Sequence, residues 1–362
     1  MSISRKDLKN ATLRAIALKR TTASAAILAP VETPIEAAEQ IETGLRPRAL
    51  AEYVGQAKIK EHLQIHVRAA RSRSEPLGHT LLHGPPGLGK TTLAHIIANE
   101  MGSQLKVTTG PAIEKPGDVA SLLTNLAAGD VLFIDEIHRL RPAIEEVLYG
   151  AMEDNVLDIV IGKGPTARSV RLTIKPFTLV GATTKAGAMS APLRDRFMHA
   201  FKLGFYEVGE MEQIVRRSAG ILEVPLGDSA ARSIATASRA TPRIANRLVR
   251  AVRDFAHSRA EQAVNDACVR ETLSSLDIDE TGLDATDRAL LSVIIDSFNG
   301  GPVGLSTLAA MLAEEEETIE GMYEPYLMQQ GYLVRTAKGR NVTKRAYEKL
   351  GKALPEGMQQ LF

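Results

Sequence analysis

Three short apolar runs in the first half of the chain predict the strands of a buried sheet. They cover residues 80–83, 131–134 and 177–184. The second run is continuously apolar, a pattern typical of a parallel strand that is covered on both faces. Good helix formers follow the first run at residues 92–101, and Gly102 is a suitable C-cap for that helix. Strands and helices in this order predict an α/β domain with a parallel sheet.

The pattern changes twice toward the C-terminus. Residues 207–276 have mostly helical periodicity, which predicts a small helical domain. Farther on, predicted helices precede a short hairpin with glycine at its turn, which is the order of a winged helix. The helices are residues 286–298, 306–313 and 316–330, and the hairpin strands are residues 332–335 and 340–343. The predicted organisation is a basic extension (1–40), a large α/β domain (41–206), a helical domain (207–278) and a winged-helix head (279–362).

Length and composition limit the classes of function. A chain of 362 residues suits two or three domains better than one core. Its 44% hydrophobic and 24% charged residues are ordinary for a soluble protein, and a net charge of +1 restricts any DNA contact to local patches. The single cysteine, Cys268, cannot form an intrachain disulfide, so a reducing compartment is compatible. No apolar run approaches the roughly 20 residues that cross a bilayer, so no membrane association is expected.

The first 29 residues differ in composition from the rest. They contain six Lys and Arg residues against one acid, Asp7, and lack aromatic residues. Such a start fits an organelle transit peptide or a disordered bacterial extension that touches DNA phosphates. The second interpretation is favoured and predicts a cytoplasmic bacterial protein, with residues 30–43 as a linker.

The segment from Gly84 to Thr91 has the pattern G-x-x-x-x-G-K-T, the Walker A phosphate loop. Its glycines, including Gly87 and Gly89, let backbone N–H groups point at phosphate oxygens. Lys90 supplies a positive charge to the β- and γ-phosphates, and the Thr91 hydroxyl can ligate Mg²⁺. A chance glycine turn is the alternative, but the strand before the loop and the helix after it favour ATP and Mg²⁺ as cofactors.

Polar residues at the ends of the other two strands complete a hydrolytic site. Asp135 and Glu136 follow the second strand at the edge where open α/β sheets bind ligands. Asp135 would hold Mg²⁺, and Glu136 would orient or deprotonate the attacking water. Without the phosphate loop, the same acids would be interpreted as a helix N-cap pair. Thr184, with Thr183 as second choice, would touch the γ-phosphate or the water.

Two arginines extend the site beyond this domain. Interpreted as an AAA+ motif, Arg196 reaches the nucleotide of a neighbouring subunit, where such a finger is worth about 10³–10⁵ in rate. An arginine supplied in trans predicts a ring. Thr241 and Pro242 suit the N-cap and first position of a helix, so Arg243 falls where the helix dipole disfavours a cation unless an anion such as ATP is present. Exposed surface arginines are the alternative for both positions.

The head carries a basic hairpin and an acidic helix start. Arg335, Lys338 and Arg340 cluster on the predicted wing. The run Glu314–Glu317 precedes the helix that would normally enter a major groove, and phosphates would repel it. We therefore expect the wing to touch the DNA backbone without reading sequence. A winged helix used for protein contact is an equal alternative.

Together these motifs resemble the RuvB family of AAA+ ATPases. Members of that family are hexameric ring motors that drive branch migration of four-way Holliday junctions beside RuvA, while RuvC resolves the product. The resemblance implies a homohexameric ATPase that acts on junction and duplex DNA in recombination and repair, with RuvA and RuvC as partners. Matching stretches span about residues 45–350: 84–94, 130–140, 145–149, 181–184, 241–248 and 300–305.

The resemblance also assigns individual residues. It places Leu45 and Arg46 at the nucleotide base and Tyr206 near the adenine, adds Thr92 to the nucleotide contacts, and makes Thr184 and Arg243 the two sensors. Arg196 becomes the finger, and Arg335 and Arg340 match the DNA-contacting arginines. One departure is Met198-His199 after the finger, where the family usually has glycine and an aliphatic residue.

A hairpin and two other functions complete the predictions. Residues 158–170 match the family's hairpin that docks on RuvA, and alternation would place Ile159 and Ile161 on one face as an apolar anchor. An ordinary core strand is the alternative. The alternative functions are another AAA+ machine, such as a clamp loader or unfoldase, and a junction-binding protein whose ATP site only switches assembly. The absence of an aromatic substrate loop disfavours the unfoldase, and Glu136 disfavours the switch.

Overall fold

The computed structural model describes residues 44–161, 168–260 and 263–355. The chain divides into two compact units, residues 1–45 and 46–362, and nearly all described residues belong to the second. Within that second unit, a parallel α/β core is followed by a helical lid and a winged-helix head. The predicted fold class is therefore confirmed. Along these three described stretches, no helix is both long enough and apolar enough to span a membrane.

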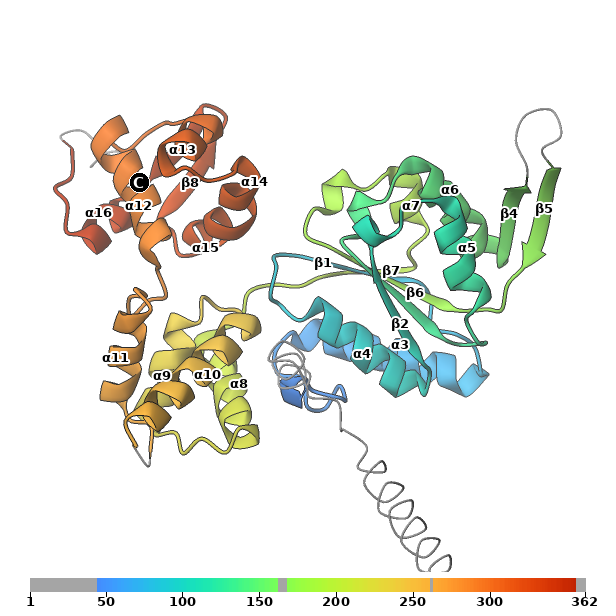
Figure 1. The fold of residues 1–362 in the computed structure, drawn as a ribbon, viewed down its shortest axis with the longest axis horizontal. Coiled ribbons are helices and arrows are strands. Elements are labelled where there is room, and N and C mark those ends of the chain that lie inside the picture. Colours follow the sequence, from blue (N-terminus) through green and yellow to red (C-terminus); the bar gives the residue numbers. More distant parts are fainter. Residues whose placement is uncertain (1–43, 162–167, 261–262, 356–362) are drawn as a thin grey trace, which may run out of the picture. The chain divides into compact units, whose positions relative to one another are not determined.

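The core contains a five-stranded parallel sheet with the order β2-β3-β6-β1-β7 (Figure 1). In its register, Leu82 lies opposite Ala182 and Phe133 lies opposite Val180. Because all strands are parallel, their carboxyl ends meet at one edge, which brings together the loops that follow β1, β3 and β6. The strands are β1 Thr80–His83, β2 Leu105–Thr109, β3 Val131–Asp135, β6 Thr178–Thr183 and β7 His199–Lys202.

Helices cover both faces of this sheet (Figure 1). Alternate side chains point to opposite faces, so Leu82 and Phe133 pack with α3 and α4, whereas Leu81 and Leu132 pack with α5, α6 and α7. Each such side chain contributes about 1.5–3 kcal/mol when fully buried. The helices are α3 Ala57–Arg73, α4 Lys90–Met101, α5 Pro116–Thr124, α6 Pro142–Asp154 and α7 Ala191–Asp195, with short 3₁₀ turns at Gly110–Ala112, Ile137–Arg139 and Ala186–Ala188.

An antiparallel hairpin, β4 Val156–Ile161 and β5 Arg168–Thr173, projects from the core (Figure 1). In its register, Ile159 lies opposite Val170. The alternative of an ordinary strand in the core sheet does not fit, because these strands form a separate two-stranded sheet. The side chains of Ile159 and Ile161 lie outside the described residues, so the apolar anchor stays a prediction.

The lid is built from amphipathic helices. In α10, the buried residues Ala245, Leu248, Val249, Val252 and Ala256 follow helical spacing and face the other lid helices. The lid helices are α8 Val208–Ile221, α9 Asp228–Ala237, α10 Pro242–Ser258 and α11 Asp266–Ser275.

The head has the predicted three helices and hairpin, with two differences. The third helix is interrupted by a π turn just before Pro325, because proline has no N–H for the i→i−4 ladder. A final helix, α16, was not predicted. The elements are α12 Ala285–Phe298, α13 Leu305–Leu312, α14 Glu316–Thr318, the π turn Ile319–Tyr323, α15 Glu324–Gln329, β8 Leu333–Thr336, β9 Gly339–Val342 and α16 Lys344–Leu350.

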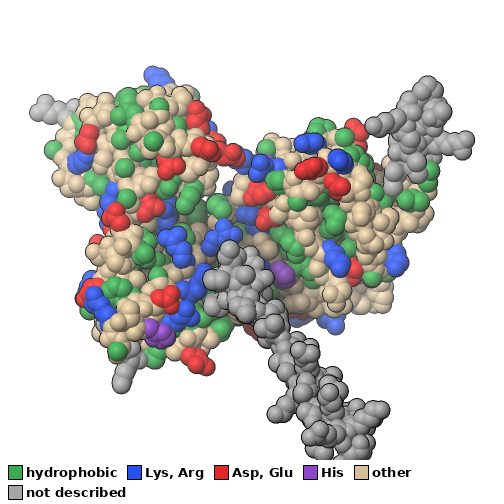
Figure 2. All heavy atoms as spheres, viewed as in Figure 1, with side chains coloured by type: hydrophobic (Ala, Val, Ile, Leu, Met, Phe, Trp, Pro, Cys, Tyr) green, Lys and Arg blue, Asp and Glu red, His purple; other side chains and the backbone are tan. Residues whose placement is uncertain are grey.

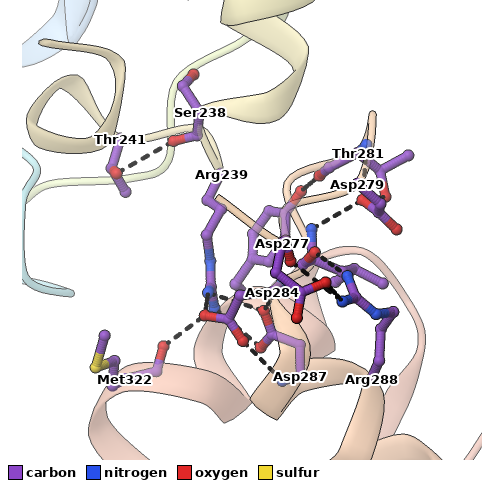
Figure 3. Close-up of polar contacts among 12 residues, drawn as sticks. Ser238, Arg239, Thr241, Asp277, Asp279, Thr281, Asp284, Asp287, Arg288 and Met322 are labelled. Carbon is purple, nitrogen blue, oxygen red and sulfur yellow. Dashed lines mark hydrogen bonds and ion pairs between the residues drawn. The ribbon is translucent and has the colours of Figure 1, made fainter. Parts of the chain in front are cut away.

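A buried arginine joins the lid to the head (Figure 3). Arg239, between α9 and α10, donates to both carboxylate oxygens of Asp287 at 2.9 and 3.2 Å and lies over the Tyr326 ring. Asp287 is fully buried; burial raises its pKa to about 7, and the Arg239 charge opposes that shift. Asp287 also caps α12 together with Asp284. This contact links Arg239, which lies two residues before the N-cap of α10, to the first turn of α12 in the head.

Candidate nucleotide site

The loop between β1 and α4 has a conformation that requires glycine. Gly84 and Gly89 have positive φ values of 143° and 96°. A Cβ at Gly84 would lie 2.5 Å from the Leu203 carbonyl oxygen, and one at Gly89 would lie 2.9 Å from the Tyr53 hydroxyl. The loop leads directly into the N-terminus of α4, where Thr91 and Thr92 are half-buried in the first turn. A glycine loop at a helix N-terminus is suited to binding phosphate.

Lys90 is a buried cation that forms no ion pair with a carboxylate among the described residues. Its side chain is 8% exposed, and Nζ donates to the carbonyl oxygens of Gly84 at 2.8 Å and Pro85 at 2.9 Å. Burial lowers the pKa of Lys90, whereas the charges of Asp135 and Glu136 raise it. No ion pair to Lys90 occurs in the part of the chain that the structure describes. A nucleotide triphosphate would give Lys90 a directly bound anionic partner, so the residues fit this ligand.

The acids at the end of β3 lie beside the end of β6. Glu136 adopts a left-handed conformation with φ of 49°, and its N–H donates to Asp135 Oδ1 at 2.9 Å. The Thr184 hydroxyl donates to Glu136 Oε2 at 3.3 Å. The structure therefore brings Thr184 to Glu136, the acid that is predicted to orient or deprotonate the attacking water.

His138 is a residue of this cluster that the sequence did not reveal. Its Nδ1 lies 3.2 Å from Glu136 Oε2 and 2.9 Å from the hydroxyl of Thr183. Burial lowers its pKa and the Glu136 charge opposes the shift. Thr183 is completely buried and also accepts from the Lys185 N–H. Thr183 thus connects to Glu136 through His138, whereas Thr184 contacts Glu136 directly. The only signal was the position of His138 two residues after the acids.

Two tyrosines hold the backbone of the phosphate loop. The Tyr206 hydroxyl lies 3.1 Å from the Leu88 carbonyl oxygen and 2.8 Å from the Tyr53 hydroxyl, which donates to the same carbonyl at 3.3 Å. Tyr206 is 4% exposed, and burial raises its pKa to about 12. Tyr206 thus contacts the backbone of the phosphate loop, and its contact with the adenine stays a prediction. Tyr53 was not predicted, because nothing in its local sequence marks it.

The predicted base contacts lie at the start of the described chain. Leu45 is buried and Arg46 is half-buried. Burial lowers the pKa of His95 on α4, and the positive charge of Arg46 lowers it further. Arg46 is therefore close to the helix that begins at the phosphate loop.

The start of α10 reaches the phosphate loop. The Arg243 N–H donates to the Gly87 carbonyl oxygen at 3.4 Å, and the side chain of Arg243 is exposed. Thr241 occupies the N-cap position, but its hydroxyl donates to Ser238 O and leaves the helix without a side-chain cap. The first turn of α10 therefore places the exposed Arg243 beside the phosphate loop, at a helix N-terminus that favours an anion.

Arg196 is held by side chains of α6 and by the backbone at the start of α7. Its guanidinium pairs with Glu153 at 3.0 Å, donates to Pro192 O at 2.8 Å and lies 4.3 Å above the Tyr149 ring. The following Met198 is 74% exposed. The ring of His199 lies against the ring of His66 on α3, with the centroids 4.0 Å apart and the planes tilted by 33°. The position of Arg196 is compatible with action in a neighbouring subunit.

The wing cations are mostly paired. Arg335 forms an exposed ion pair with Glu320 at 2.6 Å, and Lys338 is exposed in the turn. Arg340 is only 7% exposed and is held by the buried Glu324 at 2.6 and 3.4 Å. Arg340 could reach a phosphate only by leaving this carboxylate. Figure 2 shows acidic side chains on the α14 side of the head, where residues 315–317 are exposed.

Comparison with known families agrees with this architecture. Residues 45–203 match the model of the Holliday junction DNA helicase RuvB P-loop domain, residues 206–279 the RuvB AAA lid domain, and residues 280–351 the RuvB C-terminal winged helix domain. Proteins named Holliday junction branch migration complex subunit RuvB from Chloroflexus aurantiacus and Chloroflexus aggregans are each 57% identical over 318 residues, covering 88% of this chain and 91% of the relative. The solved RuvB branch migration motor of Thermotoga maritima is 48% identical with a TM-score of 0.79, covering 86% of this chain and all of that one (100%).

Proposed function

Because the chain belongs to the RuvB family of AAA+ ATPases, we propose that it is the ATP-driven motor subunit of a Holliday junction branch migration complex. The observation that carries the proposal is the convergence of Lys90, Glu136 and the start of α10 at one edge of a parallel sheet. These elements come from the core and the lid, so nucleotide binding and release can change how the two are held together. An attached winged-helix head supplies a surface for DNA.

Each residue has a defined task in hydrolysis. Lys90 and the loop N–H groups bind the β- and γ-phosphates, with Gly87 and Gly89 allowing their close approach. Thr91 and Asp135 would hold Mg²⁺, which neutralises developing charge on the phosphates when it is bound. Glu136 orients the attacking water and accepts its proton, while Thr184 fixes the Glu136 carboxylate. Arg243 pairs with the γ-phosphate and reports its loss to the lid.

The partners follow from the same family membership. We infer a complex with RuvA and junction DNA, assembled as a homohexamer in which Arg196 completes the neighbour's site. The β4–β5 hairpin would dock on RuvA through Ile159 and Ile161. Arg335 and Lys338 would contact the DNA backbone, and Arg340 would join them only by leaving Glu324. RuvC would join as the resolving nuclease, and the protein would work in the bacterial cytoplasm.

The deciding experiment measures ATP-dependent dissociation of a synthetic four-way junction, with and without a RuvA protein. Dissociation that requires both ATP and RuvA is the expected result, and a Glu136→Gln variant that binds ATP without turnover is the matched control. ATP turnover stimulated by DNA without any junction movement would overturn the proposal. In that case a clamp-loading or unfolding activity would be tested next.

A further inference from the structure

Helix α6 presents three polar residues to the short helix that carries Arg196. Glu145, Tyr149 and Glu153 are spaced four residues apart and share one face of α6. All three contact residues between Ser190 and Arg196. The first two belong to the stretch 145–149, which the proposed function gives no role.

The first contact anchors the start of α7. Glu145 is 6% exposed, and its Oε2 accepts from the Ser190 hydroxyl at 2.5 Å and from the Tyr149 hydroxyl at 3.1 Å. Ser190 in turn is the N-cap of α7 and accepts from the Leu193 N–H at 3.3 Å. A helix of five residues has little stability of its own, so this network decides where α7 begins.

The second contact orients the arginine itself. The Arg196 guanidinium lies over the Tyr149 ring with its carbon 4.3 Å from the centroid. Arg196 Nε is buried and has no hydrogen-bond partner among residues 44–161, 168–260 and 263–355. The aromatic face is therefore a principal contact for this side of the cation, worth about 0.5–2 kcal/mol depending on how completely water is excluded. The terminal nitrogens are held by Pro192 and Glu153.

We propose that Tyr149 is a positioning residue for the arginine finger. Its ring fixes the plane of the Arg196 guanidinium, and its hydroxyl joins the Glu145–Ser190 anchor, so the finger leaves α7 in one orientation toward the neighbouring nucleotide. This inference rests on the proposed action of Arg196 in trans. A displacement of about 1 Å at a reacting centre can lower a rate by about 10², so the loss of one aromatic ring has a measurable effect.

Steady-state ATP turnover of the full-length protein on DNA provides the first test. Tyr149→Leu should lower kcat by about 10²-fold and leave KM nearly unchanged, because the finger acts on charge that develops only in the transition state. Tyr149→Phe keeps the ring and should stay within a few-fold of the native rate. Equal losses in both variants, or a loss confined to KM, would contradict the proposal.

Mixed rings provide the second test. A variant with a general folding defect would not restore turnover in such rings. Tyr149→Leu subunits retain their own nucleotide site, so mixing them with Glu136→Gln subunits, whose fingers are intact, should restore turnover. Mixing them with Arg196→Ala subunits should not, because every finger in such rings is impaired. Restoration by Arg196→Ala subunits would assign Tyr149 to another task.

The control mixture is Arg196→Ala with Glu136→Gln. If it recovers turnover while the Tyr149→Leu mixture with Glu136→Gln does not, Tyr149 is not a positioning residue and the proposed function stands. If the control also fails, action in trans is wrong and the Tyr149 proposal falls with it.

Discussion

The cations of the nucleotide site and those of the winged-helix head differ in their partners. At the nucleotide site, neither Lys90 nor Arg243 forms an ion pair with any described residue, and Lys90 is held only by backbone carbonyls. In the head, Arg335 and Arg340 each pair with a glutamate that lies 15 or 16 residues earlier in the chain. The cations of the nucleotide site are therefore available to an anionic ligand, whereas those of the wing are largely neutralised by carboxylates of the head.

This difference fits two kinds of ligand. A triphosphate with its cation must be bound tightly and in one geometry, and unpaired cations at fixed positions provide this. DNA that moves past a motor must be held without sequence preference and then released. A wing with few unpaired charges makes weak contacts of that kind. The following predictions test each side of the comparison, from the largest expected effect to the smallest.

Lys90→Ala should remove ATP turnover, with a loss of at least about 10²–10³-fold, because one fixed donor to the transferred phosphoryl group is gone. The stability of the protein without nucleotide should not fall. Burial lowers the pKa of Lys90, so the charged form of this side chain is less favourable in the folded protein than in water. Calorimetry with and without ATP checks both parts: ATP should raise the Tm of the native protein and not that of the variant. Turnover at the native rate would overturn the site assignment.

Arg340→Met should behave in the reverse manner and destabilise the head by about 3–5 kcal/mol, because it leaves the Glu324 carboxylate buried without its partner. The double variant Arg340→Met with Glu324→Leu should recover most of this loss. Scanning calorimetry of the full-length variants measures the difference. If the single variant is as stable as the native chain, Arg340 is not a structural cation and is available to DNA.

The sequence predicted those features that are local or periodic. The phosphate loop, the acids after β3 and the glycine-turned wing each occupy a few consecutive residues with a fixed chemical pattern. The pairing of Tyr53 with Tyr206 joins residues that are 153 positions apart, and Arg239 meets Asp287 across 48 positions. No repeat or spacing in the sequence predicts such contacts, because they depend on how helices and strands pack against one another. For the same reason, the sequence did not reveal that the wing arginines pair with Glu320 and Glu324 of the preceding helical segment.

Arg335→Ala combined with Lys338→Ala should weaken duplex DNA binding and reduce its salt dependence by about 0.9 log unit for each lost phosphate contact. Lys338 is exposed and forms no ion pair within the described ranges, so it should carry more of this effect than Arg335 does. Fluorescence anisotropy with labelled duplex over a series of salt concentrations gives the slope. ATP turnover without DNA should be unchanged, which makes it the control. An unaltered slope would place the DNA contact elsewhere.

Glu320→Gln should produce the smallest effect, and in the opposite direction. The Arg335–Glu320 pair is exposed, so it contributes only about 0.2–1 kcal/mol to stability, and removing the carboxylate should scarcely change the Tm. The same change leaves Arg335 without its partner and should steepen the salt dependence of DNA binding. Glu324→Gln is the matched comparison, because it removes a carboxylate from the buried pair with Arg340 and should lower stability. If Glu320→Gln weakened DNA binding, the carboxylate would be orienting Arg335 for a phosphate rather than competing with it, and the contrast between the two regions would no longer hold at this residue.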